Sequence, residues 1–309
     1  MDFARTAEQT AIADVARQAL ADLPPEAGWA RAVELGWTDP DLDTVTAGVI
    51  AEECGYALHR GPWVTTATVA GLVPLTRPTT LAQTGDYSFE QIGDEWVLHG
   101  RATAPPDAIL CADCVVDGLF VVDLSQTTLV PVEHAWDTTR DAYDVVFDGT
   151  PARALDGAFE MDDLALTLYA CEAVGSARRA VDVAVEHAGT RVQFGRPIGV
   201  NQAVAHPLAE VYASVELAHS LAYRAAWSVG EGEPSARADA LAAACATRET
   251  AVAAWETAIQ TLGAVGFTWE HPAHQWYRRA LWHHAHGGDP ATLRAELSDL
   301  ILPAGRDAS

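Results

Sequence analysis

Lysine is absent from this chain of 309 residues, so arginine supplies most of its positive charge: Lys and Arg together number 19. Against them stand 43 Asp and Glu residues, which leave a formal net charge of -24 at pH 7. A surface this acidic repels the phosphate backbone of nucleic acids, which we therefore exclude as partners. Any anion site in this protein must use arginine forks, backbone amides or helix N-termini.

Long apolar runs and cysteine pairs are scarce as well. A membrane span needs about 18 uninterrupted apolar residues, and no such stretch occurs. The opening Met1-Asp2-Phe3 lacks the basic start of a secretory signal, so we expect a cytoplasmic protein without a membrane partner. The five cysteines are too few for a disulfide scaffold. Cys111 and Cys114 lie in an alternating apolar run, which favours strand packing over a redox or zinc site.

The hydrophobic pattern changes its period twice along the chain. Apolar residues recur at helical spacing from Phe3 to about Leu58, form short β-rich runs from about Tyr87 to Ala154, and return to helical spacing from Asp162 onward. The predicted fold class is therefore α+β. We predict an N-terminal helical domain over residues 1–80, a reduced, antiparallel β domain over 81–156 and an antiparallel four-helix bundle over 157–309.

Long alanine-rich segments define the predicted bundle, because small side chains let helix axes approach closely. They run over Leu164 to Gly189, Ala203 to Val229 and Ser235 to Gly263, with a shorter helix around Ala291 to Leu302.

Two stretches of the C-terminal third are specific in sequence. RVQFGRPIGVNQAVAHPLA, Arg191 to Ala209, reads as a helix end, a Gly-Arg-Pro turn and a new helix. In QTLGAVGFTWEHPAHQWYRRA, Gln260 to Ala280, Gly263 and Gly266 allow close backbone approach to a ligand or another chain. Taken singly, either stretch is also explained as a corner between two bundle helices.

Together, and in this order of domains, the two stretches resemble the acyl-CoA dehydrogenase family. The opening MDFARTAEQTAIADVARQAL and the segment Ile50 to Trp63 are similar to the N-terminal domain of that family. The resemblance implies FAD at a dimer interface, where it removes a hydride from the β-carbon of an acyl-CoA thioester. It also implies a glutamate that takes the α-proton.

The resemblance places one half of a cofactor site in this chain. Its RxQFG element corresponds to Arg191, Gln193 and Phe194, and implies contact with the pyrophosphate and adenine of a FAD in the neighbouring subunit. A guanidinium suits a diphosphate and a phenyl face suits a purine. Gln202 matches the glutamine that closes the element. The QxxGG element, at the same adenine end, corresponds to Gln260, Leu262, Gly263 and Ala264.

The catalytic half is missing from the sequence. The position of the family's usual base is Gly287, and the alternative position on the first bundle helix is Ala165, so neither carries a carboxylate. In the β domain, the family's flavin-lining Trp-Ile-Thr is replaced by Ala104-Pro105-Pro106. We therefore expect no catalytic residue and no flavin-ring site of this chain's own.

The leading hypothesis is a half-site subunit of a heteromer. Such a chain supplies the ADP-binding part of the FAD site to a complete catalytic partner, in an α2β2 assembly that dehydrogenates an acyl-CoA bound mainly by the partner. Actinobacterial enzymes of sterol side-chain degradation have this two-chain form, so a steroid acyl-CoA is the substrate class that the resemblance favours.

Three alternatives remain open at this point. A self-sufficient enzyme could use a relocated base, Asp289 or Glu172. A metal or redox protein could use the Cys pair with the histidines between Trp282 and His286, but their spacing does not place three imidazoles on one helical face, so we expect no metal. A flavin-free scaffold has no chemical need for the RxQFG side chains.

Overall fold

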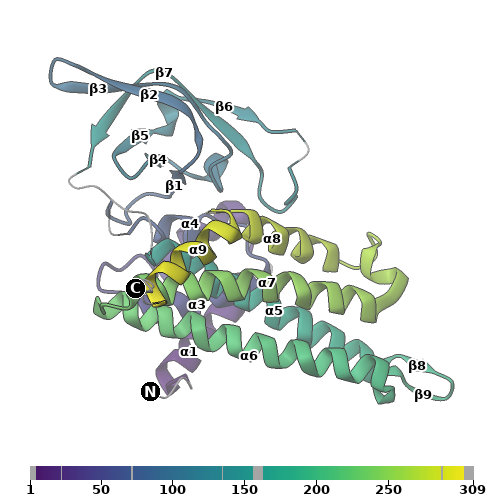
Figure 1. Cartoon of the computed structure of the whole chain (residues 1–309). Helices are drawn as coiled ribbons and strands as arrows, with labels where there is room; N and C mark the ends of the chain where they lie inside the picture. The colour runs from purple at the N-terminus through teal and green to yellow at the C-terminus, as the bar shows by residue number, and fades with distance from the viewer. Residues whose placement is uncertain are drawn as a thin grey trace, which may run out of the picture. The chain divides into compact units, whose positions relative to one another are not determined.

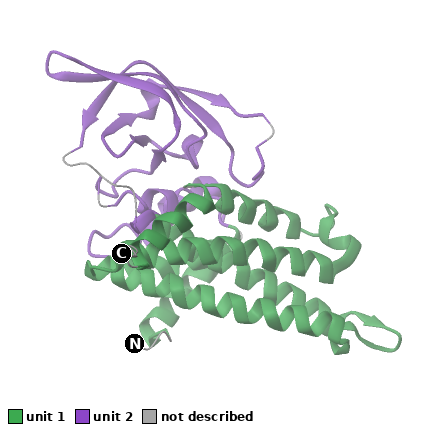
Figure 2. Ribbon diagram, viewed as in Figure 1, with its two compact units in different colours: residues 1–20, 44–58, 166–309 green, residues 21–43, 59–165 purple. Residues whose placement is uncertain are grey.

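The computed structural model describes residues 5–21, 23–70, 72–133, 135–155, 163–286 and 288–302. Figure 2 shows its division into two compact units. Unit 1 comprises residues 1–20, 44–58 and 166–309, and unit 2 comprises residues 21–43 and 59–165. The chain therefore passes between the units several times within its first 60 residues. The three-part division by sequence stays a prediction about the order of secondary structure along the chain.

Unit 1 is helical, as the periodicity predicts. Its long helices are α5 (Asp163–Thr190), α6 (Gln202–Glu231) and α7 (Ala236–Leu262), within one or two residues of the predicted ends. The shorter α8 (Ala273–Ala285) and α9 (Pro290–Ile301) both pack against α7, and α8 was expected only as part of a corner. From the N-terminal third, α1 (Ala7–Leu20) and α3 (Thr44–Ala57) also belong to this unit (Figure 1).

Small residues set the helix spacing in unit 1. The bundle core is mostly alanine, and its largest members are the stacked rings of Trp255 and Trp276, whose centroids are 5.6 Å apart. The sequence Glu-x-x-Gly occurs on both α3 and α5. A Cβ on Gly55 would overlap the carbonyl oxygen of Glu172, and a Cβ on Gly175 would overlap that of Glu52. Glycine is thus required on each helix for the two backbones to touch.

Unit 2 combines short helices with a curled sheet. The helices include α2 (Gly28–Glu34) and α4 (Trp63–Ala67). The described residues form a seven-stranded sheet in the order β1-β4-β5-β7-β3-β2, with β6 also paired to β7. The strands are β1 (Thr79–Ala82), β2 (Gly85–Ile92), β3 (Glu95–Ala102), β4 (Asp113–Val116), β5 (Phe120–Asp123), β6 (Thr128–Pro131) and β7 (Tyr143–Ala154).

The sheet differs from the predicted one in two respects. It begins at Thr79 rather than near Tyr87. The sequence pattern does not reveal β1, because all four of its residues are buried and show no alternation. It is also not wholly antiparallel, since β1 and β4 pair in parallel. Its core gathers the inward residues of the predicted runs, including Leu98, Cys114 and Phe147. Within the described residues, no helix is both long and apolar enough to cross a membrane.

Candidate functional site

The two motifs meet at one end of the helical bundle. Helix α5 ends and α6 begins at this end, and because α7 runs back alongside α6, α7 ends there and α8 begins there. Figure 1 shows the α5–α6 hairpin and the α7–α8 connection at the same end of the bundle. The structure therefore gathers both sets of sequence-predicted cofactor residues on one part of unit 1.

The first motif forms a β-hairpin that the sequence did not predict. Strands β8 (Val192–Gln193) and β9 (Arg196–Pro197) pair antiparallel around a two-residue loop. Both loop residues have positive φ, 51° at Phe194 and 79° at Gly195, as in a type I′ turn. The Phe194 side chain is 99% exposed. An aromatic residue held in a left-handed conformation with its ring in solvent is strained, a feature that concentrates at functional sites.

Polar side chains beside this loop are available to a ligand. Arg191, Gln193 and Gln202 are all exposed. The Arg191 guanidinium forms no ion pair within the described part of the chain. By contrast, Arg196 donates to Asn201 Oδ1 at 3.0 Å. Gln193 Nε2 donates only to the carbonyl oxygen of Val192 beside it, at 2.9 Å, which leaves its amide oxygen open.

The second motif ends α7 and exposes its polar and backbone groups. Gln260 is exposed in the last turn, and Gly263 ends the helix with φ of 70°, its N–H donating to the Gln260 carbonyl oxygen. Ala264 follows, exposed, in a short 3-10 turn that also presents Phe267, 69% exposed. Leu262 is buried, so it offers a ligand its backbone rather than its side chain.

These groups fit the ADP half of a dinucleotide. One unpaired guanidinium can bind a diphosphate, exposed aromatic rings can stack on a purine, and side-chain amides supply hydrogen-bond donors and acceptors. No lysine exists to take the place of Arg191. Apart from Leu262, which is buried, and Gly263, which is half-buried, the cofactor residues predicted by sequence are exposed at this end of the bundle, and their role stays a prediction.

The positions of the missing base hold no carboxylate in the sequence. Ala165 is buried on α5, and Gly287 lies outside the described residues. Next to it in the chain, the His286 ring stacks on Trp282 with centroids 4.2 Å apart.

Both relocated-base candidates have structural partners. Asp289 is the N-cap of α9, where its Oδ2 accepts from the Thr292 N–H at 3.1 Å. Glu172 is fully buried on α5, and its Oε1 accepts from Arg279 Nη1 at 2.8 Å. His283 Nε2 lies 3.5 Å from its other oxygen.

The segment aligned with the flavin-lining residues is held within unit 2. Ala104 has a positive φ of 40°, and its N–H donates to Asp144 Oδ1 at 3.1 Å. The Pro106 carbonyl oxygen accepts a hydrogen bond from Thr80 Oγ1. Asp107, which follows, accepts from Thr65 Oγ1 at 2.6 Å. Ala104 and Pro106 are thus held by hydrogen bonds to residues of β7 and β1.

The cysteine pair packs in the sheet core. Cys114 is buried on β4, and burial raises its pKa to about 12. Burial likewise raises the pKa of the Cys111 thiol well above its ordinary value. Neither is a thiolate at neutral pH, which a metal ligand or nucleophile must be. Within the described ranges, no three His, Cys, Asp or Glu residues are placed to hold a metal ion.

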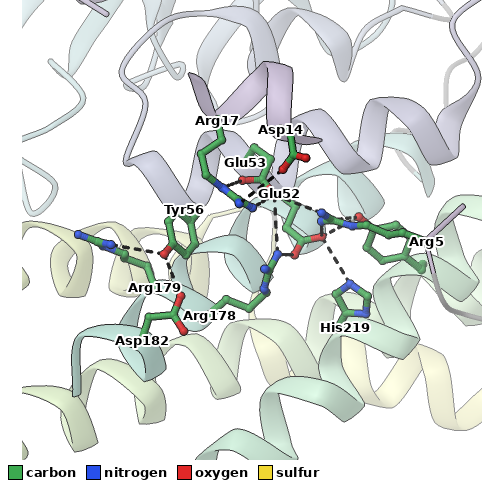
Figure 3. A network of polar contacts seen from close by, with 11 residues as sticks. Arg5, Asp14, Arg17, Glu52, Glu53, Tyr56, Arg178, Arg179, Asp182 and His219 are labelled. Atoms are coloured by element: carbon green, nitrogen blue, oxygen red, sulfur yellow. Dashed lines mark hydrogen bonds and ion pairs between the residues drawn. The ribbon is translucent and has the colours of Figure 1, made fainter. Parts of the chain in front are cut away.

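Sequence reasoning missed the densest polar cluster of unit 1, shown in Figure 3. Glu52 and Glu53 on α3 are both fully buried. Glu52 Oε2 accepts from Arg5 Nη2 at 2.6 Å and from the Tyr223 hydroxyl at 2.6 Å. Glu52 Oε1 pairs with Arg178, and His219 Nε2 lies 3.5 Å from Oε2. Two adjacent glutamates inside an otherwise apolar helix were the available signal.

The charges of this cluster compensate one another. Burial alone would raise the pKa of Glu52, but the hydrogen bond from His219 and the positive charges of Arg178 and Arg5 outweigh burial and hold the pKa well below its ordinary value. Arg17 donates two hydrogen bonds of 2.9 Å to the Glu53 carboxylate. The Glu52 carboxylate stays ionised, and the contacts of the two glutamates hold α1, α3, α5 and α6 together.

Comparison with known proteins places this geometry in a family. The acyl-CoA dehydrogenase C-terminal domain matches residues 167–301. The chain is 39% identical over 254 residues to acyl-CoA dehydrogenase FadE34 of Mycobacterium tuberculosis, which covers 77% of this chain and 35% of FadE34. It therefore spans about a third of that relative's length. It is 32% identical over 238 residues to acyl-CoA dehydrogenase IpdE2 of Mycolicibacterium smegmatis, which covers 76% of this chain and 71% of IpdE2.

The fold has close counterparts among solved structures. A variant of the Tcur3481-Tcur3483 steroid acyl-CoA dehydrogenase superposes with a TM-score of 0.83 at 22% identity, over 95% of this chain and 97% of the matched chain. This likeness confirms the predicted α+β fold of the acyl-CoA dehydrogenases. With the domain match and the extended identity to IpdE2, the chain belongs to the acyl-CoA dehydrogenase family.

Proposed function

We propose that this chain is the half-site subunit of a heteromeric, FAD-dependent acyl-CoA dehydrogenase. It holds the ADP end of a FAD whose flavin ring and catalytic base belong to a partner subunit. The observation that carries this proposal is an asymmetry: the polar and aromatic side chains of both cofactor elements are exposed at one end of the bundle, whereas both base positions carry residues without a carboxylate.

Each exposed group has a definite task in this proposal. The Arg191 guanidinium binds the diphosphate in a charge-assisted contact, and the Phe194 ring covers the adenine. Gln193, Gln202 and Gln260 supply amide donors and acceptors around them, and the Gly263 turn leaves room for close approach of the backbone. FAD, when bound, supplies the chemistry that accepts a hydride from the β-carbon of the acyl group.

The proton at the α-carbon must then be taken by the partner. Glu172 is neutralised by Arg279 in the bundle core, and Asp289 is engaged as a helix cap. Glu172 is buried, and Asp289, although exposed, accepts the N–H of Thr292. We infer that the partner carries the catalytic glutamate that this family uses.

A two-chain enzyme agrees with what the similar proteins are. The matched solved structure is named for two proteins together and as a steroid acyl-CoA dehydrogenase. FadE34 extends well beyond the third that matches this chain, which leaves room for a second part of similar size. We propose an α2β2 assembly with one FAD for each pair of unlike subunits, acting on a steroid side-chain acyl-CoA.

Purification tests this function. The chain is expressed alone and together with a complete acyl-CoA dehydrogenase encoded beside it, and bound FAD and acyl-CoA oxidation are measured. We expect no FAD and no turnover for the chain alone, and one FAD per pair with activity for the complex. Flavin and turnover in the chain alone would favour a relocated base. A stable complex whose flavin content does not depend on this chain would favour the scaffold alternative.

A further inference from the structure

Arg248 is a buried cation in the middle of α7. Arg248 is only 4% exposed. One hydrogen bond anchors the guanidinium, from Nη1 to the Gly288 carbonyl oxygen at a long 3.4 Å. A carbonyl oxygen accepts a hydrogen bond but carries no charge that would neutralise the guanidinium.

The position of Arg248 along the bundle axis follows from the stacked rings of Trp255 and Trp276. Trp255 on α7 packs on Trp276 of the antiparallel α8. Two turns back along α7 and two turns forward along α8 lead from this pair to Arg248 and His283. The contact with Gly288, just beyond the end of α8, agrees with that position. Arg248 therefore lies beside the turn that joins α8 to α9.

Among the described residues, Arg248 differs from the other buried arginines in its lack of a carboxylate partner. Among the described residues, three arginines are buried. Arg279 pairs with Glu172 at 2.8 Å, and Arg140 lies 3.5 Å from Asp107. Arg248 has no carboxylate partner within the described ranges.

The neighbours of Arg248 do not supply the missing charge. Glu249, next in the chain, pairs with Arg294 instead. Burial lowers the pKa of the Arg248 guanidinium, and only the Cys245 thiol opposes this effect. Even so, an arginine remains charged at neutral pH.

A buried charge without a counter-ion is costly, and the cost falls when an anion enters the site. We propose that the Arg248 guanidinium binds a small carboxylate anion beside the Gly288 carbonyl oxygen. The planar fork of a guanidinium matches a carboxylate with two parallel hydrogen bonds. Formate is the smallest carboxylate and is therefore the probe for this site.

Thermal unfolding of the full chain tests this site. Sodium formate replaces sodium fluoride at constant ionic strength, and the melting temperature is followed for the wild type, Arg248→Met and Arg294→Met. Because an anion that binds only the folded chain stabilises it, we expect a saturating rise of about 2–4 °C in the wild type. Arg294→Met, an exposed arginine on the neighbouring helix, should keep this rise, and Arg248→Met should lose it.

A second variant covers a failure of Arg248→Met to fold. Arg248→Lys keeps the charge but loses the fork, so formate affinity, measured by NMR saturation transfer, should fall about tenfold. A wild type that does not respond to formate overturns the proposal, as does an equal response in the wild type and an Arg248 variant. Flavin and partner take no part in these measurements, so their outcome is independent of the proposed enzyme function.

Discussion

Phe194 combines an unfavourable backbone conformation with complete exposure of its ring. A non-glycine residue with φ of 51° pays about 1 kcal/mol for crowding between its Cβ and the backbone. The folded chain regains nothing for this cost, because the ring makes no buried contact. Both the aromatic side chain and the strained turn are explained if the ring is used by another molecule.

Replacement of Phe194 by glycine should therefore separate stability from function. We expect Phe194→Gly to raise the free energy of unfolding by about 1 kcal/mol, because glycine adopts positive φ freely. The same change should weaken FAD retention in the complex, because the ring is lost. Phe194→Ala is the matched control, since it removes the ring but keeps the strain. Urea unfolding and flavin absorbance give the two readouts, and unchanged flavin retention in both variants would argue against a role for the ring.

Glu52 is an example of a buried charge that the sequence did not predict. Its partners come from residues 5, 178, 219 and 223, so the cluster exists only once the helices have packed. Each partner looks like an ordinary surface residue in its own stretch of sequence. The sequence likewise does not show that Arg248 lacks a carboxylate partner among the described residues, because this depends on how the helices pack.

Glu52→Gln should lower the free energy of unfolding by about 3 kcal/mol at pH 7, because it leaves the partly buried Arg5 and Arg178 without their counter-charge. The folded-state pKa of Glu52 lies below its ordinary value, so its stabilising effect is present above that value. It is lost as the pH falls, and the gap between wild type and variant should narrow below about pH 4.5. Urea unfolding from pH 7 to pH 3 checks this.

The exposed pair of Glu34 with Arg31, on α2, offers a matched control. Glu34→Gln should change the free energy of unfolding by less than about 0.5 kcal/mol, because solvent screens exposed pairs. A gap for Glu52→Gln that is no larger than that of Glu34→Gln would mean that the cluster does not stabilise the fold.

At the level of elements, the crossing of α3 and α5 depends on a glycine from each helix. Gly175→Ala places a methyl group against the Glu52 carbonyl oxygen, which is backbone and cannot move aside alone. We expect the free energy of unfolding to fall by at least about 2 kcal/mol. Gly189, on the same helix, has nothing within 4 Å of an added Cβ.

Gly189→Ala is therefore the control for Gly175→Ala, and it should stabilise the chain by about 0.5 kcal/mol through helix propensity. Both variants are compared by urea unfolding. Equal effects of the two substitutions would show that the helices do not meet at Gly175.

The predictability of an element followed the strength of its own pattern. The long bundle helices were predicted within two residues because a 3.6-residue period repeats over many turns in each. The four-residue β1 carries no alternation, so its start was missed and its parallel pairing with β4 was not foreseen. The β8–β9 hairpin was predicted only as a turn, since two-residue strands leave no periodic trace.

For the whole molecule, motifs predicted the family, whereas long-range packing decided how the chain divides into compact units. The sequence divides into three blocks, yet the compact units share the N-terminal third, with α1 and α3 in one and α2 and α4 in the other. Local patterns cannot show which unit a helix joins, because that choice depends on partners far along the chain.

The most direct test of the central claim is FAD retention in the purified heteromeric complex that carries Arg191→Ala. We predict that FAD affinity falls about tenfold or more while the complex stays assembled, because a charge-assisted contact to the diphosphate is lost. Arg31→Ala, which removes another exposed arginine of this chain, should leave FAD affinity unchanged. Equal FAD affinity in the wild type and Arg191→Ala would contradict the claim that this chain holds the nucleotide end of its partner's flavin.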